Sequence, residues 1–496
     1  MNVKRPGHRR RTFSVWWDRP RRAATSGYRG ARVVRATIPR IQANVSRKAF
    51  FKKFVACRQP VVLSGLLPEL AGFDGVHWPD AAQRQMVEVE VRDSPKDRFG
   101  RGRRETMRFG ELLEKLNAGD TSRYLTTQEI PDGQLVAPPL SALGDSVLPL
   151  RPKLLQTLCP QSINLWLGRS SAPASSGLHH DFHDNLYCLL SGTKRFRLFS
   201  PADATHMQTA GSITRIHANG RINYSGDEPT AADGRTKEDA ASEVAMQTAH
   251  RARERQRQAE VSLQSAEARA ARATSAGERS QAARAVQNAE AALDDALDGV
   301  MEADGAARKR RRLQRKRDLR MDAEGSTRPP EGTTPKNFST LGALELDGSG
   351  QLPAAIRGIP MAECELRAGE MLYLPCGWFH EVRSSGSHCA LNYWFHPPDA
   401  AEFERPYRKK GFWRREWQRM LNAHVGADPE HGTFARDTIV APHAAPPHGK
   451  PSHTNAATRI GSKTTTTSSA VDESTESRER DGSGSSLDAI FGYHMR

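Results

Sequence analysis

The sequence predicts a mainly β protein with flanking helices, interrupted by a long charged insertion. Runs rich in Val, Leu, Ile, Phe and Tyr recur between turns containing Gly or Pro, as β-strands do, at residues 60–65, 162–168, 185–198, 371–374 and 389–395. Residues 237–320 hold many good helix formers but few large apolar side chains. The hydrophobic fraction of 37% is low for a chain folded throughout, so part of it is expected to lie outside any core.

The first part of the chain is expected to enter the fold through a helix. Residues 1–38 are rich in Arg and poor in acids, which favours a disordered basic arm; a transit peptide or a nuclear signal is the alternative. Residues 46–55 predict a helix with three phenylalanines on one side, Phe50, Phe51 and Phe54. A strand and a turn are then expected at residues 60–65.

Strands and one further helix follow. Val and Glu alternate over residues 87–91, as in an edge strand with one solvated face. Residues 109–116 predict a helix. Apolar and β-branched residues predict two more strands, at residues 123–128 and at residues 162–168.

Residues 176–201 carry the densest chemistry, and they predict two strands joined by a turn at Ser191 and Gly192. In an extended chain, residues two apart share a face, so His179 and Asp181 are expected to point the same way. An imidazole and a carboxylate side by side supply two thirds of the facial triad that holds non-haem Fe(II) with open positions.

Lys194 lies on the second of these strands, on the same face as Phe196 and Leu198. Arg195 and Arg197 alternate with this set and are expected on the other face. The first set is taken as the inner face, where an ammonium group among apolar neighbours is unfavourable unless an anion meets it. Lys194 is therefore a candidate anion-binding residue.

The triad needs a third ligand, and His380 is the candidate. It follows a predicted strand at residues 371–374 and a turn, and a third strand is expected at residues 389–395. His183 is the rival ligand, because it lies two residues beyond the aspartate and shares its face if the strand continues straight. His388 is expected in a loop.

At these residues the chain resembles the Jumonji-C (JmjC) domain, of the small cupin-like type that includes asparaginyl and lysyl protein hydroxylases. The family pattern is His-x-Asp, an Asn four residues after the Asp, Gly-x-Lys, a distant His after a turn, and Asn-x-Trp. The matching residues here are His179, Asp181, Asn185, Gly192, Lys194, His380, Asn392 and Trp394. The resemblance covers roughly residues 40–225 and 335–400 and implies a double-stranded β-helix, the jelly-roll barrel of the cupins.

The resemblance implies a site for Fe(II) and 2-oxoglutarate, with O2 as a further co-substrate. His179, Asp181 and His380 would bind the metal, and no catalytic residue separate from the metal site is expected. Lys194 would pair with the distal carboxylate of 2-oxoglutarate, and further contacts to the co-substrate would come from Ser176, Asn185, Asn392 and Tyr124. Two alternatives stay open: Ser176 as a turn-capping serine, and Tyr124 as a half-buried strand tyrosine.

The implied activity is hydroxylation of a protein side chain, or demethylation of an N-methyl group, with release of CO2 and succinate. The alternative is a catalytically silent JmjC-fold binding module for protein or nucleic acid. A protein substrate is the expected partner, nucleic acid is a second candidate through the basic segments, and the oligomeric state is open. No apolar run approaches the length of a membrane span.

The insertion at residues 226–334 separates the two parts of the barrel, residues 39–225 and 335–400. Long surface insertions change the closure entropy of a chain little, so the barrel can tolerate it. Its apolar residues do not sustain heptads, which favours isolated helix or partial disorder over a stable coiled coil. Its basic run at residues 308–317 is either a solvated face, a nuclear import signal or a contact to nucleic acid.

A C-terminal helix is expected at residues 401–425, packed on the barrel, followed by a disordered tail at residues 426–496. The six cysteines form no Cys-x-x-Cys pair, which is typical of reduced thiols in an intracellular protein. The nucleus and the cytoplasm are both candidate compartments, and import into an organelle is a further alternative.

Overall fold

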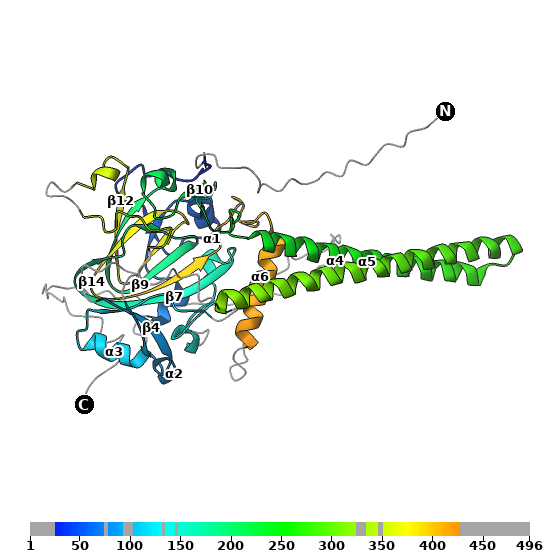
Figure 1. The fold of residues 1–496 in the computed structure, drawn as a ribbon, viewed down its shortest axis with the longest axis horizontal. Coiled ribbons are helices and arrows are strands. Elements are labelled where there is room, and N and C mark those ends of the chain that lie inside the picture. Colours follow the sequence, from blue (N-terminus) through cyan, green and yellow to red (C-terminus); the bar gives the residue numbers. More distant parts are fainter. Residues whose placement is uncertain are drawn as a thin grey trace, which may run out of the picture.

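The computed structural model describes residues 25–73, 78–92, 103–130, 134–143, 147–323, 334–345 and 351–426. In this part of the chain a large β domain carries a projecting pair of long helices, α4 (Lys237–Arg272) and α5 (Ala276–Ala323) (Figure 1). The predicted class, mainly β with flanking helices and a charged insertion, is confirmed. The predicted C-terminal tail lies outside the described residues from position 427 onward.

Eleven strands form the main sheet, in the order β2-β3-β13-β9-β14-β7-β6-β4-β5, with β12 beside β9 and β8 beside β14. This sheet is the predicted double-stranded β-helix. Its strands are β2 (Arg40–Gln42), β3 (Val61–Ser64), β4 (Met86–Val91), β5 (Arg103–Arg108), β6 (Arg123–Leu125), β7 (Pro160–Ser175), β8 (His179–His180), β9 (Asp184–Phe199), β12 (Ala362–Arg367), β13 (Glu370–Leu374) and β14 (Phe379–Phe395). A second sheet holds β1 (Thr25–Ser26), β10 (Ile213–Ile216) and β11 (Ile222–Tyr224).

The turn predicted at Ser191 and Gly192 is wrong, because β9 passes through this point as one strand. Both halves of β9 pair with β14, while β13 covers the other edge of the first half and β12 that of the second. The register shifts near this point, so the strands bulge where a reversal was expected. Gly192 has φ +81°, and an added Cβ would lie 2.5 Å from the carbonyl oxygen of Ser387.

Strand β14 is likewise continuous from His380 to the predicted third strand, which is therefore not separate. The strand at residues 87–91 is not at an edge either, since β4 lies between β5 and β6. The valines of this strand, Val87, Val89 and Val91, are buried, but the glutamate face is not fully solvated, since Glu90 is 4% exposed. Strand β5 at the end of the sheet was not predicted.

Short helices flank the sheet: α1 (Arg47–Phe50), α2 (Asp80–Gln83) and α3 (Phe109–Asn117), with 3-10 helices at Pro68–Phe73, Leu140–Ala142, Lys153–Leu155, Pro201–His206 and Ala354–Ile356. The side chain of Ser46 accepts a hydrogen bond from the Ala49 amide and caps α1, which continues into a π-helical turn at Phe51–Val55. The predicted phenylalanine face is buried in the largest core cluster. The C-terminal helix α6 (Lys410–Gly426) begins later than expected.

The segment before the barrel is ordered further toward the N-terminus than predicted. Strand β1 pairs in parallel with β10, and Ile38 is 7% exposed. The basic arm expected at residues 1–38 is therefore too long, and residues 1–24 lie outside the described residues. The high arginine content predicted a solvated segment. Its backbone instead pairs with β10 in the second sheet, and such long-range pairing leaves no local sequence pattern.

The insertion forms a pair of helices where isolated helix or disorder was expected. Thr236 and Asp239 form a capping box that starts α4, so the helix begins later than the predicted start of the insertion at residue 226. Three buried alanines, Ala249, Ala252 and Ala303, let the helices approach closely without large apolar groups. The basic run at residues 308–317 lies in the C-terminal part of α5. No helix in the described ranges is both long and apolar enough to cross a bilayer.

Candidate metal centre and co-substrate cavity

Two strand segments bring the three predicted metal ligands together. Strand β8 pairs with β14, which places His179 opposite His380, and Asp181 follows directly after β8. One potential ligand atom of each residue lies within 4.8 Å of the others. His380 Nε2 is 3.9 Å from Asp181 Oδ2, and the two imidazole rings are 4.3 Å apart between centroids. Two imidazoles and one carboxylate in this arrangement suit a facial triad.

Backbone carbonyls set the tautomer of both histidines. His179 Nδ1 donates to the carbonyl oxygen of Gly177 at 3.0 Å, and His380 Nδ1 donates to that of Trp378 at 3.0 Å. A carbonyl oxygen can only accept, so each Nε2 keeps its lone pair for a metal. Burial, together with the neighbouring His380, lowers the pKa of His179 to about 3, so this imidazole is neutral near pH 7.

Neighbouring side chains hold the ligands in place. Asn185 Nδ2 donates to Asp181 Oδ2 at 3.3 Å. The ring of Phe338 stacks on His179 with centroids 4.5 Å apart. The rival ligand His183 lies elsewhere, packed against Trp394 at 5.9 Å between ring centroids, and does not join the metal-capable cluster of the described residues. Strand β8 ends at His180 and the chain bends at Phe182 and His183, so the straight-strand argument for His183 does not hold.

A cavity of about 240 Å³ opens beside this cluster. Its lining includes every predicted site residue: His179, Asp181, His380, Lys194, Ser176, Asn185, Asn392 and Tyr124. In the pairing of β9 with β14, Leu198 lies opposite His380 and Lys194 lies opposite Ser384. Four residues of strand, about 13 Å, therefore separate the two register positions. The cavity thus has a ligand cluster and a lysine at different positions along its wall.

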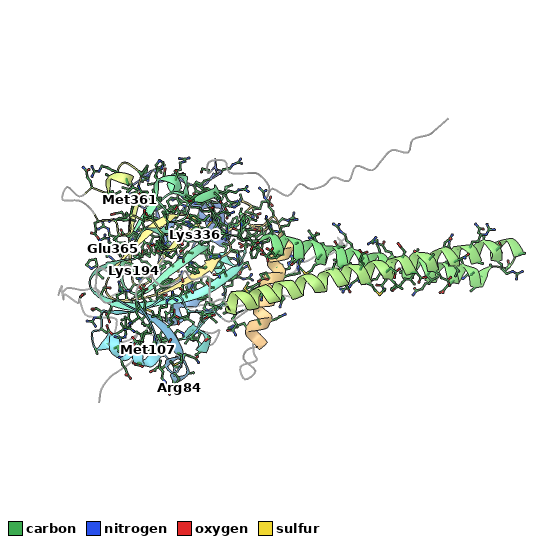
Figure 2. All side chains as sticks on the ribbon, viewed as in Figure 1. Arg84, Met107, Lys194, Lys336, Met361 and Glu365 are labelled. Atoms are coloured by element: carbon green, nitrogen blue, oxygen red, sulfur yellow. The ribbon has the colours of Figure 1, made fainter. Side chains whose placement is uncertain are left out.

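Lys194 is 2% exposed and lies within the β domain, away from the projecting helices α4 and α5 (Figure 2). Its ammonium group donates to the Tyr124 hydroxyl at 3.2 Å, and no ion pair to it is found within the described ranges. Burial lowers the pKa of Lys194 to about 7. Burial likewise raises the pKa of Tyr124 above its ordinary value, so this phenol stays neutral. A cation held this way is ready to accept an anion from the cavity.

The remaining predicted co-substrate contacts differ in whether their polar atoms already form hydrogen bonds within the protein. Asn392 Oδ1 accepts a hydrogen bond from Trp166 Nε1 at 3.0 Å. The side-chain oxygen of Asn185 is buried without a hydrogen-bond partner in the described structure. The Ser176 hydroxyl donates to the Gly177 carbonyl at 2.9 Å and accepts from the Val382 amide at 2.9 Å, which is the turn-stabilising role left open above.

Comparison with known proteins decides the family. Residues 47–401 match the family model of the cupin-like domain. The chain belongs to the cupin-like domain family. It is 32% identical over 427 residues to the JmjC domain-containing protein 4 of Schizosaccharomyces pombe, a match that covers 75% of this chain and 87% of that protein. The resemblance to JmjC proteins is thereby confirmed.

Two further relatives of this cupin-like protein match over shorter stretches. The human bifunctional peptidase and (3S)-lysyl hydroxylase JMJD7 is 46% identical over 44 residues, 9% of this chain and 13% of that protein. The tRNA wybutosine-synthesizing protein 4 of Neurospora crassa is 29% identical over 182 residues, 34% of this chain and 14% of that protein.

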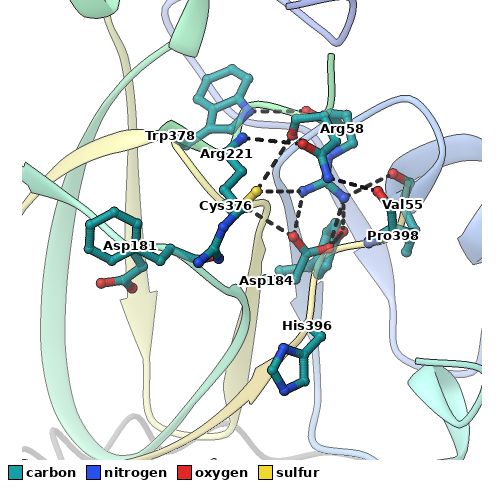
Figure 3. A network of polar contacts seen from close by, with 12 residues as sticks. Val55, Arg58, Asp181, Asp184, Arg221, Cys376, Trp378, His396 and Pro398 are labelled. Atoms are coloured by element: carbon teal, nitrogen blue, oxygen red, sulfur yellow. Dashed lines mark hydrogen bonds and ion pairs between the residues drawn. The ribbon is translucent and has the colours of Figure 1, made fainter. Parts of the chain in front are cut away.

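A buried ion pair between Arg58 and Asp184 was not predicted (Figure 3). In this cupin-like domain the Arg58 guanidinium contacts both carboxylate oxygens of Asp184, one of them at 2.8 Å, and both side chains are at most 4% exposed. Asp184 also accepts from the Tyr373 hydroxyl at 2.7 Å and from the Cys376 amide at 3.0 Å. The carbonyl of Arg58 accepts from Trp378 Nε1 at 3.1 Å.

This network joins the two segments that carry the ligands. Asp184 lies three residues after Asp181, and the turn that it anchors leads directly to His380. The turn itself bonds back to the first segment, since the Gly377 amide donates to the Asp181 carbonyl at 2.9 Å. Gly377 has φ +76°, and an added Cβ would lie 1.9 Å from the Gly220 carbonyl oxygen, so no larger residue fits. The network therefore fixes the two ligand segments relative to each other.

His388 is the clearest functional candidate that sequence reasoning missed. The expectation of a loop is wrong, because His388 lies in β14, is 1% exposed and lines the cavity. The residue shares sequence parity with Asn392 and Trp394, which also line the cavity. That parity was a usable signal, but only if residues 379–395 had been taken as one strand.

Proposed function

We propose that this protein is an Fe(II)- and 2-oxoglutarate-dependent dioxygenase that hydroxylates a protein side chain. The observation that carries the proposal is one cavity that combines a His-Asp-His cluster within 4.8 Å with a buried lysine lacking an ion pair in the described structure. The cluster offers nitrogen and carboxylate donors, which suit Fe(II). The lysine offers a counter-charge for a carboxylate, which suits the distal end of 2-oxoglutarate.

The chain's own residues prepare the reaction. His179, Asp181 and His380 would hold the metal, and the Nδ1–H bonds to backbone carbonyls keep both imidazoles oriented before it arrives. Bound Fe(II) would supply the activation of O2, coupled to oxidative decarboxylation of 2-oxoglutarate. That chemistry would place one oxygen atom in succinate and the other in a C–H bond of the substrate.

Lys194 and Tyr124 would bind the co-substrate carboxylate, and Asn185 would hold Asp181 in position. Hydroxylation of a side chain and removal of an N-methyl group differ only in which carbon lies next to the metal, so the same residues serve both. The human relative's name includes (3S)-lysyl hydroxylase, which supports a protein side chain as substrate and hydroxylation as the reaction.

The test is turnover of 2-oxoglutarate by purified protein with Fe(II) and O2. We expect succinate to form slowly without substrate and faster in cell extract, where one protein gains the mass of one oxygen atom. His380→Ala should remove this activity. His183→Ala, which removes a half-buried histidine outside the metal-capable cluster, should retain it. Metal-dependent binding of partners without succinate formation would instead support the silent binding module.

A further inference from the structure

His388 carries an unexplained polar atom at the wall of the cavity. The residue lies opposite Gly168 in the β14–β7 pairing, and its Nδ1 donates to the Gly386 carbonyl at 3.0 Å. A carbonyl accepts only, so Nε2 carries a lone pair in the neutral ring. This nitrogen is buried and has no hydrogen-bond partner in the described structure. Unsatisfied buried nitrogens are rare in folded proteins and point to a missing partner.

The surroundings of His388 are basic. Its ring centroid is 5.6 Å from that of Tyr124, whose hydroxyl accepts from Lys194. The Arg92 guanidinium lies 5.9 Å from the centre of the same tyrosine ring. Tyr187 and Cys389 also face Lys194, and burial raises the pKa of both, so neither supplies a negative charge near pH 7. Three basic groups thus share this part of the cavity wall. The buried carboxyl group of Glu90 also acts on this region, since it is 4% exposed and lies opposite Tyr124 in the β4–β6 pairing. No ion pair to Lys194 is found among the described residues.

Without a bound anion, His388 is expected to be mostly neutral. Burial, and next the charge of Lys194, lowers the pKa of His388 well below its ordinary value. A carboxylate beside both groups would reverse this effect, because an opposite charge at short range favours the protonated forms. An incoming anion should therefore bring a proton with it.

We propose that His388 determines the affinity for the dicarboxylate co-substrate: together with Lys194 it holds the distal carboxylate, and it takes up a proton from solvent when the carboxylate binds. The proton adds to the Nε2 lone pair, and the new N–H donates to a carboxylate oxygen. This inference rests on the proposed function, since it assumes that a 2-oxoacid with a distal carboxylate enters the cavity.

The test is anaerobic titration calorimetry of Mn(II)-loaded protein with 2-oxoglutarate, in two buffers with different ionisation enthalpies. At a pH below the pKa of Lys194 that lysine already carries its proton, so any uptake reports on another group. We expect uptake by the unchanged protein. His388→Leu should abolish the uptake and weaken 2-oxoglutarate binding by about tenfold, or ~1.4 kcal/mol. His388→Gln should regain part of the affinity but none of the uptake.

Two controls separate the possible failures. The ligand 2-oxobutanoate lacks the distal carboxylate and should bind equally to unchanged protein and to His388→Leu. His183→Gln removes a half-buried histidine outside the cavity lining and should change neither quantity. If the unchanged protein does not bind 2-oxoglutarate at all, the proposed function fails. If it binds, and His388→Leu keeps either its affinity or its proton uptake, the role of His388 is refuted while the proposed function stands.

Discussion

The buried pair between Arg58 and Asp184 offers the sharpest mutational test of how the metal centre is built. Arg58→Met keeps much of the side-chain volume but leaves a carboxylate that is 0% exposed with only neutral donors. Removing one partner of a buried ion pair lowers the free energy of unfolding by about 3–5 kcal/mol. We expect a loss of this size in urea or thermal unfolding of the metal-free protein.

The same change should also act on the metal. Asp184 fixes the turn that leads to His380, so its misplacement should weaken Mn(II) binding, and partners behind metal ligands are typically worth about 10- to 100-fold in affinity. The measurement is Mn(II) titration under conditions where the variant is still folded. Arg40→Met is the matched control, because Arg40 pairs with Glu370 at the surface and its side chain is 43% exposed. Arg40→Met should lower the free energy of unfolding by at most about 1 kcal/mol. Equal effects of the two changes on metal affinity would refute the positioning role.

Three further predictions concern the cavity and the helix pair α4 and α5. His179→Ala should abolish binding of one Fe(II) or Mn(II) per chain in a metal titration, and His183→Ala should leave it largely intact; the reverse result would reassign the ligand. Lys194→Met should weaken 2-oxoglutarate binding by at least about tenfold. The same change should raise the melting temperature of the empty protein. Burial lowers the pKa of Lys194, so its charge destabilises the folded state increasingly as the pH falls from the lysine pKa of the unfolded chain to about 7. Replacing residues 237–320 with a short Gly/Ser linker should leave uncoupled 2-oxoglutarate turnover nearly unchanged. Insoluble protein would show that helices α4 and α5 stabilise the barrel.

The alternation of residues along predicted strands was enough to predict most of the candidate site. The parity of His179 and Asp181, and the inward placement of Lys194, follow from alternation along a strand, and the cavity gathers all three. The helical character of the insertion followed from composition. The packing of α4 against α5 did not, because small alanines leave no apolar stripe for a pattern to show.

Other features could not be predicted from the sequence because they depend on β-bulges or on pairs of residues far apart in the chain. The bulge near Gly192 resembled a turn, since glycine at positive φ serves both. The same bulged region of β14 hid the strand position of His388. Arg58 and Asp184 are separated by 126 positions in the chain, and no local pattern announces such a partnership. Arg197 was placed only on the face opposite Lys194; it is 4% exposed there, and its partners Glu363 and Glu381 lie far away in the sequence.

The central claim is that one cavity binds Fe(II) and 2-oxoglutarate together. Its most direct test is an anaerobic titration of the Fe(II)-loaded protein with 2-oxoglutarate, followed by the charge-transfer absorbance that arises when the oxoacid chelates the metal. We expect one Fe(II) per chain and a saturable band that His179→Ala removes and Lys194→Met shifts to higher 2-oxoglutarate concentrations. A protein that binds no Fe(II), or binds it without developing this band, would contradict the account.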